Sequence, residues 1–227
     1  MAQNRNIILA AKSAPEEKIF LDILNADIKA VELYLSEKVL EHTDRISALC
    51  AKFPFRYAIH APPSGCQIDK LAELTQAIHS EAVVFHNIFW EDEWPGIAEA
   101  FKKTRAKVCI ENTYSVHEPV KFERRYGFGR CVDIEHLQME CCGVYEEEFI
   151  RVLKQASHIH LTGYKFGGTK WHTPIHHSLS HGKYLMNLLE KAGYSGFVVS
   201  EARVSFQTYK EFKKLAEFWQ RNYLRSV

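Results

Sequence analysis

Val108-Cys109-Ile110-Glu111 is a short apolar run that ends in a carboxylate, and it shows the pattern from which the fold can be deduced. Runs of this length, rich in β-branched and aromatic residues, are typical of strands buried in a parallel sheet. Similar runs recur along the whole chain. We expect eight strands, at 6–11, 30–35, 57–60, 82–86, 108–111, 130–133, 158–161 and 197–201.

Longer amphipathic stretches separate these runs, and we expect helices at 15–24, 38–51, 68–79, 93–103, 116–125, 145–155, 183–192 and 208–223. This alternation predicts an α/β protein, and repeated βα units without a linker predict a (β/α)₈ barrel, a single domain over 1–227. A doubly wound open sheet is the alternative, but no GxGxxG or P-loop follows the first run. Ser13 and Pro15 predict the start of the first helix, with Ser13 as the capping hydroxyl.

Composition narrows the range of partners. The 227 residues are 46% hydrophobic and 25% charged, as expected for a globular protein. A formal charge of +1 gives no net field to drive binding to nucleic acid or to an anionic membrane. No apolar run approaches the roughly 20 residues that span a bilayer, and residues 1–6 lack the core of a signal peptide. We therefore expect a cytoplasmic protein with a small-molecule substrate and no membrane partner; the oligomeric state is not predicted.

The cysteines point to the same compartment. The chain has six, at positions 50, 66, 109, 131, 141 and 142, without a CxxC pair or a regular framework. This spacing favours reduced thiols over the disulfide scaffold of a secreted protein.

Six successive strands are expected to end in an ionisable side chain: His60, His86, Glu111, Asp133, His160 and Glu201. The carboxyl ends of the strands of a parallel barrel meet at one mouth. Because side chains alternate along a strand, the apolar neighbours should face the helices and these six should face the lumen. Those neighbours are Ile59, Phe85, Ile110, Val132, Ile159 and Val198.

Three carboxylates confined in one mouth repel one another, and a divalent cation relieves that repulsion at the least cost. We therefore expect a metal site formed by Glu111, Asp133, His160 and Glu201. Mixed carboxylate and imidazole donors suit Mn, Zn, Fe or Co better than Ca²⁺, and the pattern does not determine which of them is native. Each residue alone is typical of a helix cap or a solvated rim charge, so the prediction depends on the set.

In this order the segments resemble the xylose isomerase-like TIM barrel superfamily. That superfamily includes sugar phosphate isomerases and epimerases, inositol-catabolism barrels and endonuclease IV-like barrels. The matching segments are Ile59-His60-Ala61-Pro62, Ile110-Glu111-Asn112-Thr113, Asp133-Ile134-Glu135-His136, His158-Ile159-His160-Leu161, His172-Thr173-Pro174 and the stretch 192–201.

The resemblance implies roles for individual residues. Glu111, Asp133, His160 and Glu201 match the metal ligands of the epimerase branch, and His136 matches a residue that contacts substrate or a further metal. The residues that match positions of the multi-zinc endonuclease branch are His60, His86 and His172.

The chain also departs from the endonuclease branch. It has Lys170-Trp171-His172 where that branch has an Asp-x-His pair, and Pro63 where that branch has a Tyr. It also lacks a concentrated basic stretch that would follow a phosphate backbone.

The favoured hypothesis is a divalent-metal-dependent isomerase or epimerase acting on a small sugar or sugar-like hydroxy-carbonyl compound. Glu111 and Glu201 would be the catalytic base and acid that move a carbon-bound proton through a metal-stabilised enediolate. The substrate-binding residues would be His60, His86, His136 and His172. Three alternatives stay open: an endonuclease IV-like phosphodiesterase at abasic DNA sites, an iron-dependent oxidative enzyme on a related barrel, and a non-catalytic binding barrel.

Further histidines, His176, His177 and His181, lie in a segment that contains Gly and Pro. We expect these three to belong to a solvated loop.

Overall fold

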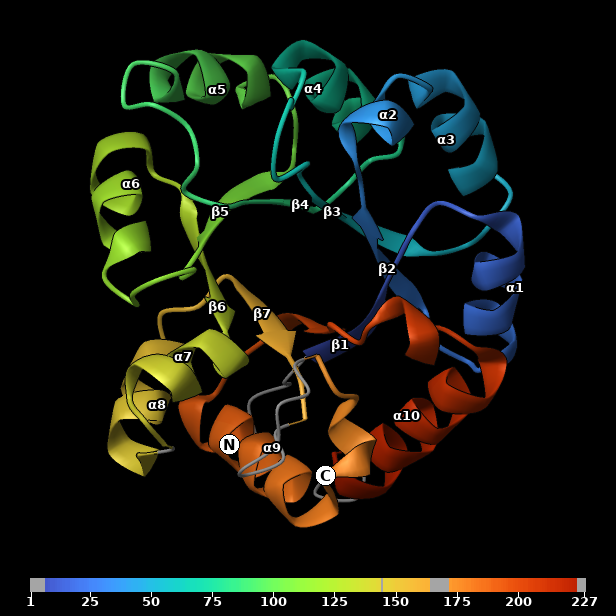
Figure 1. The fold of residues 1–227 in the computed structure, drawn as a ribbon, viewed down its shortest axis with the longest axis vertical. Helices are drawn as coiled ribbons and strands as arrows, with labels where there is room; N and C mark the ends of the chain where they lie inside the picture. Colours follow the sequence, from blue (N-terminus) through green and yellow to red (C-terminus); the bar gives the residue numbers. More distant parts are fainter. Residues whose placement is uncertain (1–6, 144, 164–171, 224–227) are drawn as a thin grey trace.

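Eight parallel strands close into a barrel in the order of the sequence, as predicted (Figure 1). The computed structural model describes residues 7–143, 145–163 and 172–223, so Asn6, expected in the first strand, lies outside the described residues. The strands are β1 (Ile7–Ser13), β2 (Ala30–Tyr34), β3 (Arg56–His60), β4 (Ala82–Phe85), β5 (Lys107–Glu111), β6 (Gly129–Asp133), β7 (His158–Leu161) and β8 (Gly196–Ser200).

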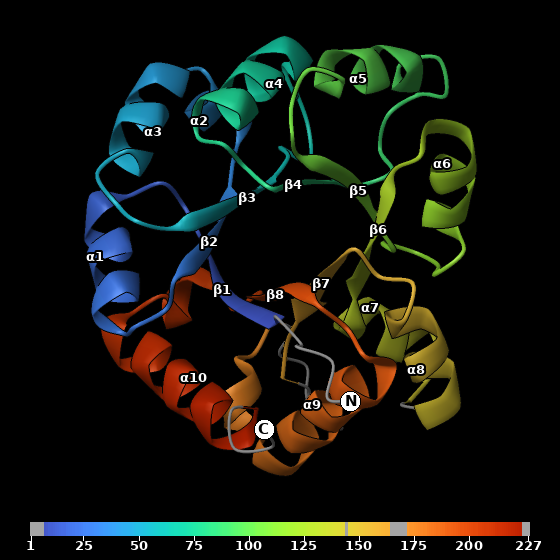
Figure 2. The ribbon, with the colours of Figure 1, turned by 180° about the vertical axis from the view of Figure 1, so that it is seen from behind.

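Helices surround the barrel on all sides, and the view from behind shows the same ring (Figure 2). They are α1 (Glu17–Asn25), α2 (Glu37–Leu40), α3 (Thr43–Cys50), α4 (Ile68–Ala77), α5 (Trp94–Phe101), α6 (Glu118–Tyr126), α7 (Ile134–Glu140), α8 (Glu146–Leu153), α9 (Leu179–Ala192) and α10 (Tyr209–Asn222). Two 3₁₀ turns, η1 (Ile175–His177) and η2 (Val204–Phe206), precede α9 and α10.

Two helical predictions need correction. The helix expected at 38–51 is two helices, of which α2 starts at a Ser36 cap and ends at Leu40. The structure also adds α7, which follows β6 without a loop. Asp133 is both the last residue of β6 and the N-cap of α7, where its side chain accepts a hydrogen bond from the backbone N–H of His136. No helix was expected between residues 133 and 145, so α7 is an element that the prediction missed.

The prediction that Ser13 caps the first helix is wrong. Ser13 pairs with Leu33 as the last residue of β1, where it is fully buried. The helix begins four residues later, after Glu16, whose side chain makes no capping hydrogen bond. The sheet therefore extends over the residue that was expected to start the helix.

The loop expected for His176, His177 and His181 is wrong, although His177 is exposed to solvent as expected. His176 and His177 lie in η1, His181 lies in α9, and His176 is buried. α9 begins at Leu179, four residues before the expected helix, and of these four residues Gly182 is buried while Leu179 is exposed.

Alternation along the strands divides the core into two layers. The six residues expected to face the helices all lie in the large apolar cluster between barrel and helices. The half of the lumen toward the N-terminal ends of the strands is filled by a separate cluster of Ala10, Ala30, Ala58, Ala82, Phe197 and Val199. Above it lie Val84, Cys109 and Cys131. Most of the polar lumen groups lie beyond these layers, toward the carboxyl ends of the strands, although Glu32 lies in the middle of β2 and His158 at the start of β7.

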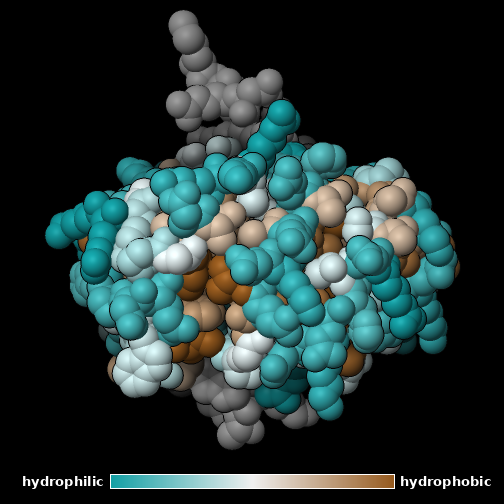
Figure 3. Space-filling view, turned by 90° about the horizontal axis from the view of Figure 1, so that it is seen from above, coloured by the Kyte–Doolittle hydropathy of each residue, from teal (hydrophilic) through white to brown (hydrophobic). Residues whose placement is uncertain are grey.

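The outside of the ring is mostly hydrophilic over α4 and α5, with apolar side chains visible between the helices (Figure 3). Among the described residues, no helix is long and apolar enough to cross a membrane. All six cysteines are free, as predicted.

We predict that Trp94→Ala destabilises the fold by about 3–5 kcal/mol, because it opens a large cavity. Trp94 is fully buried, and its ring centroid lies 4.5 Å from that of Phe122 and 5.3 Å from that of Phe89. The matched control is Trp90→Ala, since Trp90 is 79% exposed and its loss should change stability by no more than about 0.5 kcal/mol. Urea unfolding followed by circular dichroism measures both; equal losses would contradict the predicted packing of this layer.

Candidate active site at the mouth of the barrel

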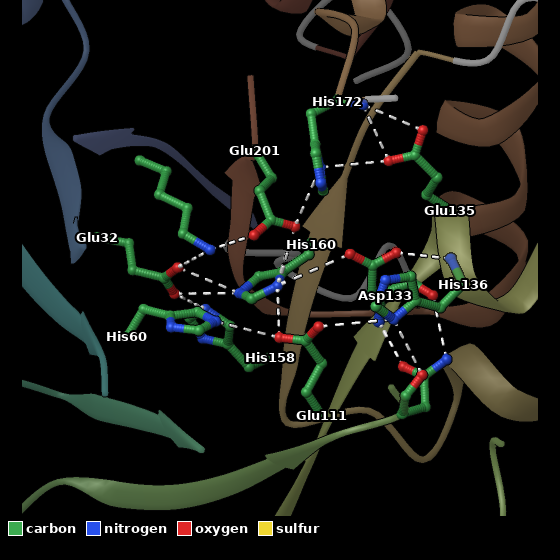
Figure 4. A network of polar contacts seen from close by, with 12 residues as sticks. Glu32, His60, Glu111, Asp133, Glu135, His136, His158, His160, His172 and Glu201 are labelled. Carbon is green, nitrogen blue, oxygen red and sulfur yellow. Dashed lines mark hydrogen bonds and ion pairs between the residues drawn. The ribbon is translucent and has the colours of Figure 1, made fainter. Parts of the chain in front are cut away.

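The six side chains expected at the strand ends all lie at the carboxyl end of the barrel. His60, Glu111 and Asp133 are the last residues of their strands, and His160 pairs in register with Asp133. The remaining two, His86 and Glu201, directly follow β4 and β8. Figure 4 shows five of the six, with the carboxylates pointing toward the ring of His160. The parallel register thus brings together residues that are distant in the sequence.

Glu111 is surrounded by imidazoles. Its Oε2 lies 3.3 Å from Nε2 of His60, 3.4 Å from Nε2 of His86 and 3.2 Å from Nδ1 of His160. Its Oε1 lies 3.7 Å from Nδ1 of His136. The side chain is buried, so four of the predicted histidines converge on one carboxylate that has little contact with water.

His160 occupies the centre of the cluster. Its Nδ1 faces three carboxylates, at 3.2 Å from Glu111 Oε2, 3.4 Å from Glu201 Oε2 and 4.0 Å from Asp133 Oδ2. All four predicted metal ligands therefore meet around a single imidazole nitrogen.

Three of these ligand atoms are buried without a hydrogen-bond partner among the described residues: Asp133 Oδ2, His160 Nδ1 and Glu201 Oε2. Ligand atoms of these three residues lie within 4.8 Å of one another. Glu111 lies equally close to His160 in a second such group and to Asp133 in a third. Buried polar atoms are normally hydrogen-bonded or bound to an ion. The donor set of carboxylates and one imidazole fits a divalent transition ion, since such an ion would supply the missing partner to all three atoms.

The structure adds three buried residues that the prediction missed. Glu32 Oε2 lies 2.7 Å from Nε2 of His158 and 3.3 Å from Nε2 of His160. Lys12 forms an ion pair with Glu201 Oε1, and its Nζ lies 3.8 Å from Glu32 Oε1. Lys12 thus holds one oxygen of Glu201, and the other faces the centre of the mouth (Figure 4).

A signal for Lys12 and Glu32 was present in the sequence. Each lies two residues beyond a lumen alanine, Ala10 or Ala30, so alternation puts both inside the barrel. The first strand was expected to end at residue 11, and Glu32 is in the middle of its strand. A search of strand ends alone could not find them.

Glu32 also fixes the chemical state of His160. When Nε2 carries a proton and donates it to Glu32, the neutral ring leaves a lone pair on Nδ1, which faces the other carboxylates. A carboxylate behind a metal-binding histidine commonly selects the ligating tautomer in this way.

The carboxylates at the mouth differ in how easily they ionise. Burial raises the pKa of Asp133 well above its ordinary value, and the charges of Glu201 and Glu111 raise it further. Burial also opposes ionisation of Glu201, but the charges of Lys12 and His160 hold its pKa well below the ordinary value. Burial opposes ionisation of Glu111 too, but the charge of His160 and hydrogen bonds with His160, His60 and His86 together hold its pKa well below the ordinary value. The repulsion expected from the sequence thus falls mainly on Asp133.

Hydrogen bonds with Asn112 and His136 fix the position of Asp133. Its N–H donates to Asn112 Oδ1 at 2.6 Å, and Asn112 Nδ2 donates to its carbonyl at 3.2 Å. Its Oδ1 accepts from the N–H of His136 at 2.8 Å, and the ring of His136 lies beside the carbonyl of Asn112. Oδ2 is the atom left for a ligand.

His172 lies at the edge of the site. Its N–H donates to both carboxylate oxygens of Glu135, and its Nδ1 lies 3.3 Å from Glu135 Oε2 and 3.9 Å from Glu201 Oε2. Its side chain is 39% exposed, so it is more open to solvent than the cluster around His160. Glu135 is a buried residue that the sequence did not single out as functional. Lys170 and Trp171 lie outside the described residues.

Comparisons with known proteins establish the fold. No protein-family model and no curated protein matches the sequence. Among solved structures, the chain is similar to D-allulose 3-epimerase from Methylomonas sp. in complex with D-allulose, with a TM-score of 0.69, 10% identity and coverage of 98% of this chain and 99% of that one. It is also similar to the tryptophan synthase α-subunit of Pyrococcus furiosus, with a TM-score of 0.61, 10% identity and coverage of 98% of each chain. Phosphoribosylanthranilate isomerase from Thermotoga maritima gives a TM-score of 0.52 at 12% identity, with coverage of 93% and 97%.

These neighbours confirm the predicted fold: the chain shares its closed parallel (β/α)₈ barrel with a D-allulose 3-epimerase. Other neighbours are barrels named for different reactions, so the fold does not determine the chemistry.

We predict that Glu32→Gln weakens binding of Zn²⁺ or Mn²⁺ by about 10- to 100-fold, because an amide cannot hold both His158 and His160 as the carboxylate does. Competition with a chromophoric chelator measures the affinity. Glu147→Gln, at an exposed position on α8, is the matched control and should bind like the wild type. An unchanged affinity in Glu32→Gln would show that the contact with His160 does not support a cation.

Cation binding should also weaken as pH falls. Burial and the charges of Glu201 and Glu111 raise the pKa of Asp133, and the charges of neighbouring acidic groups raise that of His160 in spite of its burial. Both shifts favour the protonated forms, which compete with a cation for the same atoms. Binding therefore releases protons, and affinity rises with pH. Titration calorimetry in buffers of different ionisation enthalpy should detect that release near neutral pH; binding without proton exchange would contradict this account.

Proposed function

We propose that this chain is a divalent-metal-dependent isomerase or epimerase of a small sugar or sugar-like hydroxy-carbonyl compound. The observation that carries the proposal is the arrangement of Glu111 and Glu201 on two sides of His160, beside buried ligand atoms that lack a partner. The epimerase barrel among the structural neighbours, solved with D-allulose, supports a sugar as the substrate class.

Moving a carbon-bound proton next to a carbonyl requires a group that accepts it and a group that returns it. Glu111 on β5 and Glu201 after β8 would take these roles on opposite faces of the substrate. Both pKa values are lowered, so either carboxylate can accept the carbon-bound proton. The carboxylate that returns a proton on the other face would have to enter that step protonated. Lys12 pairs with Oε1 of Glu201, which holds this carboxylate at the edge of the mouth with Oε2 facing His160.

A bound divalent cation would supply Lewis-acid polarisation of the carbonyl and the neighbouring hydroxyl, which lowers the cost of the enediolate. Its ligands would be Glu111, Asp133, His160 and Glu201. We leave its identity open among Mn, Zn, Fe and Co.

The histidines divide by exposure. The side chains of His86, His136 and His172 are 25%, 24% and 39% exposed, so they can contact a substrate at the mouth. His60 is only 2% exposed and lies against Glu111. We therefore propose that His60 positions Glu111, while the other three orient substrate hydroxyls.

The free cysteines fit a reducing compartment, and we propose a cytoplasmic location.

One observation favours a second function. His60 and His86 both approach Oε2 of Glu111, which is the kind of donor set that holds an additional zinc in a metal-dependent phosphodiesterase. Incision of a duplex that carries an abasic site tests this alternative. We expect no incision by the metal-loaded protein, and incision that is lost in Glu111→Gln would replace the isomerase by the hydrolase.

We predict that Glu111→Gln and Glu201→Gln each lower turnover by at least about 100-fold, because each removes one proton-transfer group. The assay is incubation with D-allulose and a panel of related sugars in D₂O, with Mn²⁺ or Zn²⁺ added. Deuterium incorporation at carbon is followed by NMR.

Glu147→Gln is again the matched control, and circular dichroism checks that every variant is folded. If Glu111→Gln or Glu201→Gln incorporates deuterium as fast as the wild type, the substituted residue has no part in the proposed proton transfer.

A further inference from the structure

A second cluster of histidine and carboxylate side chains lies outside the barrel lumen. Nε2 of His176 lies 2.8 Å from Oε2 of Glu211, and Nε2 of His177 lies 2.6 Å from the same oxygen. The two histidines are neighbours in η1, and Glu211 is in the first turn of α10. Two imidazoles from one segment thus aim at one carboxylate oxygen of another.

We propose that His176, His177 and Glu211 form a second divalent-cation site that is suited to zinc and separate from the centre at the barrel mouth. Their ligand atoms lie within 4.8 Å of one another, and this group shares no residue with the groups around His160. Two imidazole nitrogens and one carboxylate oxygen are a common zinc donor set, in which water completes the tetrahedron.

The side chains are held in place before any ion arrives. The rings of His176 and His177 lie 4.7 Å apart at 82°, and the ring of His177 also packs edge-on against Phe206 at 5.2 Å. Lys214 binds Oε1 of Glu211 at 3.0 Å, which leaves Oε2 for the imidazoles. A preorganised donor set loses little conformational freedom when it binds.

The three side chains of the cluster differ in their exposure to solvent. The side chain of His176 is 5% exposed and that of Glu211 15%, while that of His177 is 34% exposed. The ligands are therefore shielded from competing water on one side, and the other side gives an ion access and room for a water ligand.

Only a small movement is needed to admit the ion. Zinc–nitrogen and zinc–oxygen bonds of about 2.0–2.2 Å place tetrahedral ligand atoms roughly 3.3 Å apart. Each Nε2 would therefore move about 0.5–0.7 Å further from Oε2 than it is now. Rotation of the Glu211 side chain can provide that distance without a change in η1.

The site would link two segments that border the barrel mouth. η1 begins three residues after His172. The backbone carbonyl of His172 accepts a hydrogen bond of 3.1 Å from the backbone N–H of Arg203. Arg203 lies in the connection between Glu201 and α10. A cation held by η1 and α10 would fasten these two segments at a second point. The inference does not depend on the reaction proposed for the mouth.

The test is to count zinc on the full chain after dialysis, by elemental analysis. Glu111→Gln combined with Glu201→Gln disables the centre at the mouth, and in this background we expect one zinc per chain. Adding His177→Gln should reduce the count to near zero. Glutamine can still donate a hydrogen bond to Glu211 but cannot replace the imidazole ligand, so this change separates metal binding from the hydrogen bonds in the cluster.

His42→Gln, at an exposed histidine, is the matched control and should leave the count unchanged. If the chain with both Glu111→Gln and Glu201→Gln does not fold, His177→Gln and His42→Gln are tested one at a time in the otherwise wild-type chain. There His177→Gln should lose one zinc and His42→Gln none. A background that binds no zinc, or a count that His177→Gln leaves unchanged, would mean that the cluster is held by hydrogen bonds alone and would overturn the proposal. The zinc at the mouth is lost through Glu111→Gln and Glu201→Gln, and the zinc at this second site through His177→Gln. The zinc count can therefore disprove one site without disproving the other.

Discussion

Negative charge concentrated around one buried imidazole is the constraint on which the mouth of this barrel depends. Glu32, Glu111, Asp133 and Glu201 all approach His160, and little water reaches them to screen their repulsion. Of the described residues, Lys12 is the one ammonium group within this cluster. Glu32, Glu111 and Glu201 have lowered pKa values and carry negative charge beside Lys12 and His160, while burial disfavours the ionised form of Asp133. A divalent cation bound at Asp133 Oδ2, His160 Nδ1 and Glu201 Oε2 would stabilise all of these carboxylates in the ionised form.

The rest of the barrel makes this concentration possible. Small and apolar side chains fill the lumen below the mouth, so the polar layer rests on a packed floor. Because the strands close in sequence order with a parallel register, each strand end contributes to the same ring. Ionisable side chains from the strands, or from the residues that directly follow them, are then brought to one mouth by backbone hydrogen bonds formed elsewhere in the sheet.

Most of the fold and part of the candidate site could be predicted from the sequence. Periodicity of two placed Glu111, Asp133 and His160 in the lumen, because strand alternation is a local property of the backbone. Lys12 and Glu32 were missed since their positions depend on where β1 ends and on the depth of each residue along the barrel axis. The cluster at Glu211 depends on how η1 packs against α10, and no local pattern encodes a contact between segments 35 residues apart.

Asp133 joins the architecture of a helix to the chemistry of the mouth. One oxygen starts α7 through the amide of His136, and the other points at His160. The carboxylate plane is therefore set by the same bond that begins the helix. A change that tilts or shifts the first turn of α7 would therefore move this oxygen as well, so the start of the helix and the geometry of the mouth cannot vary independently.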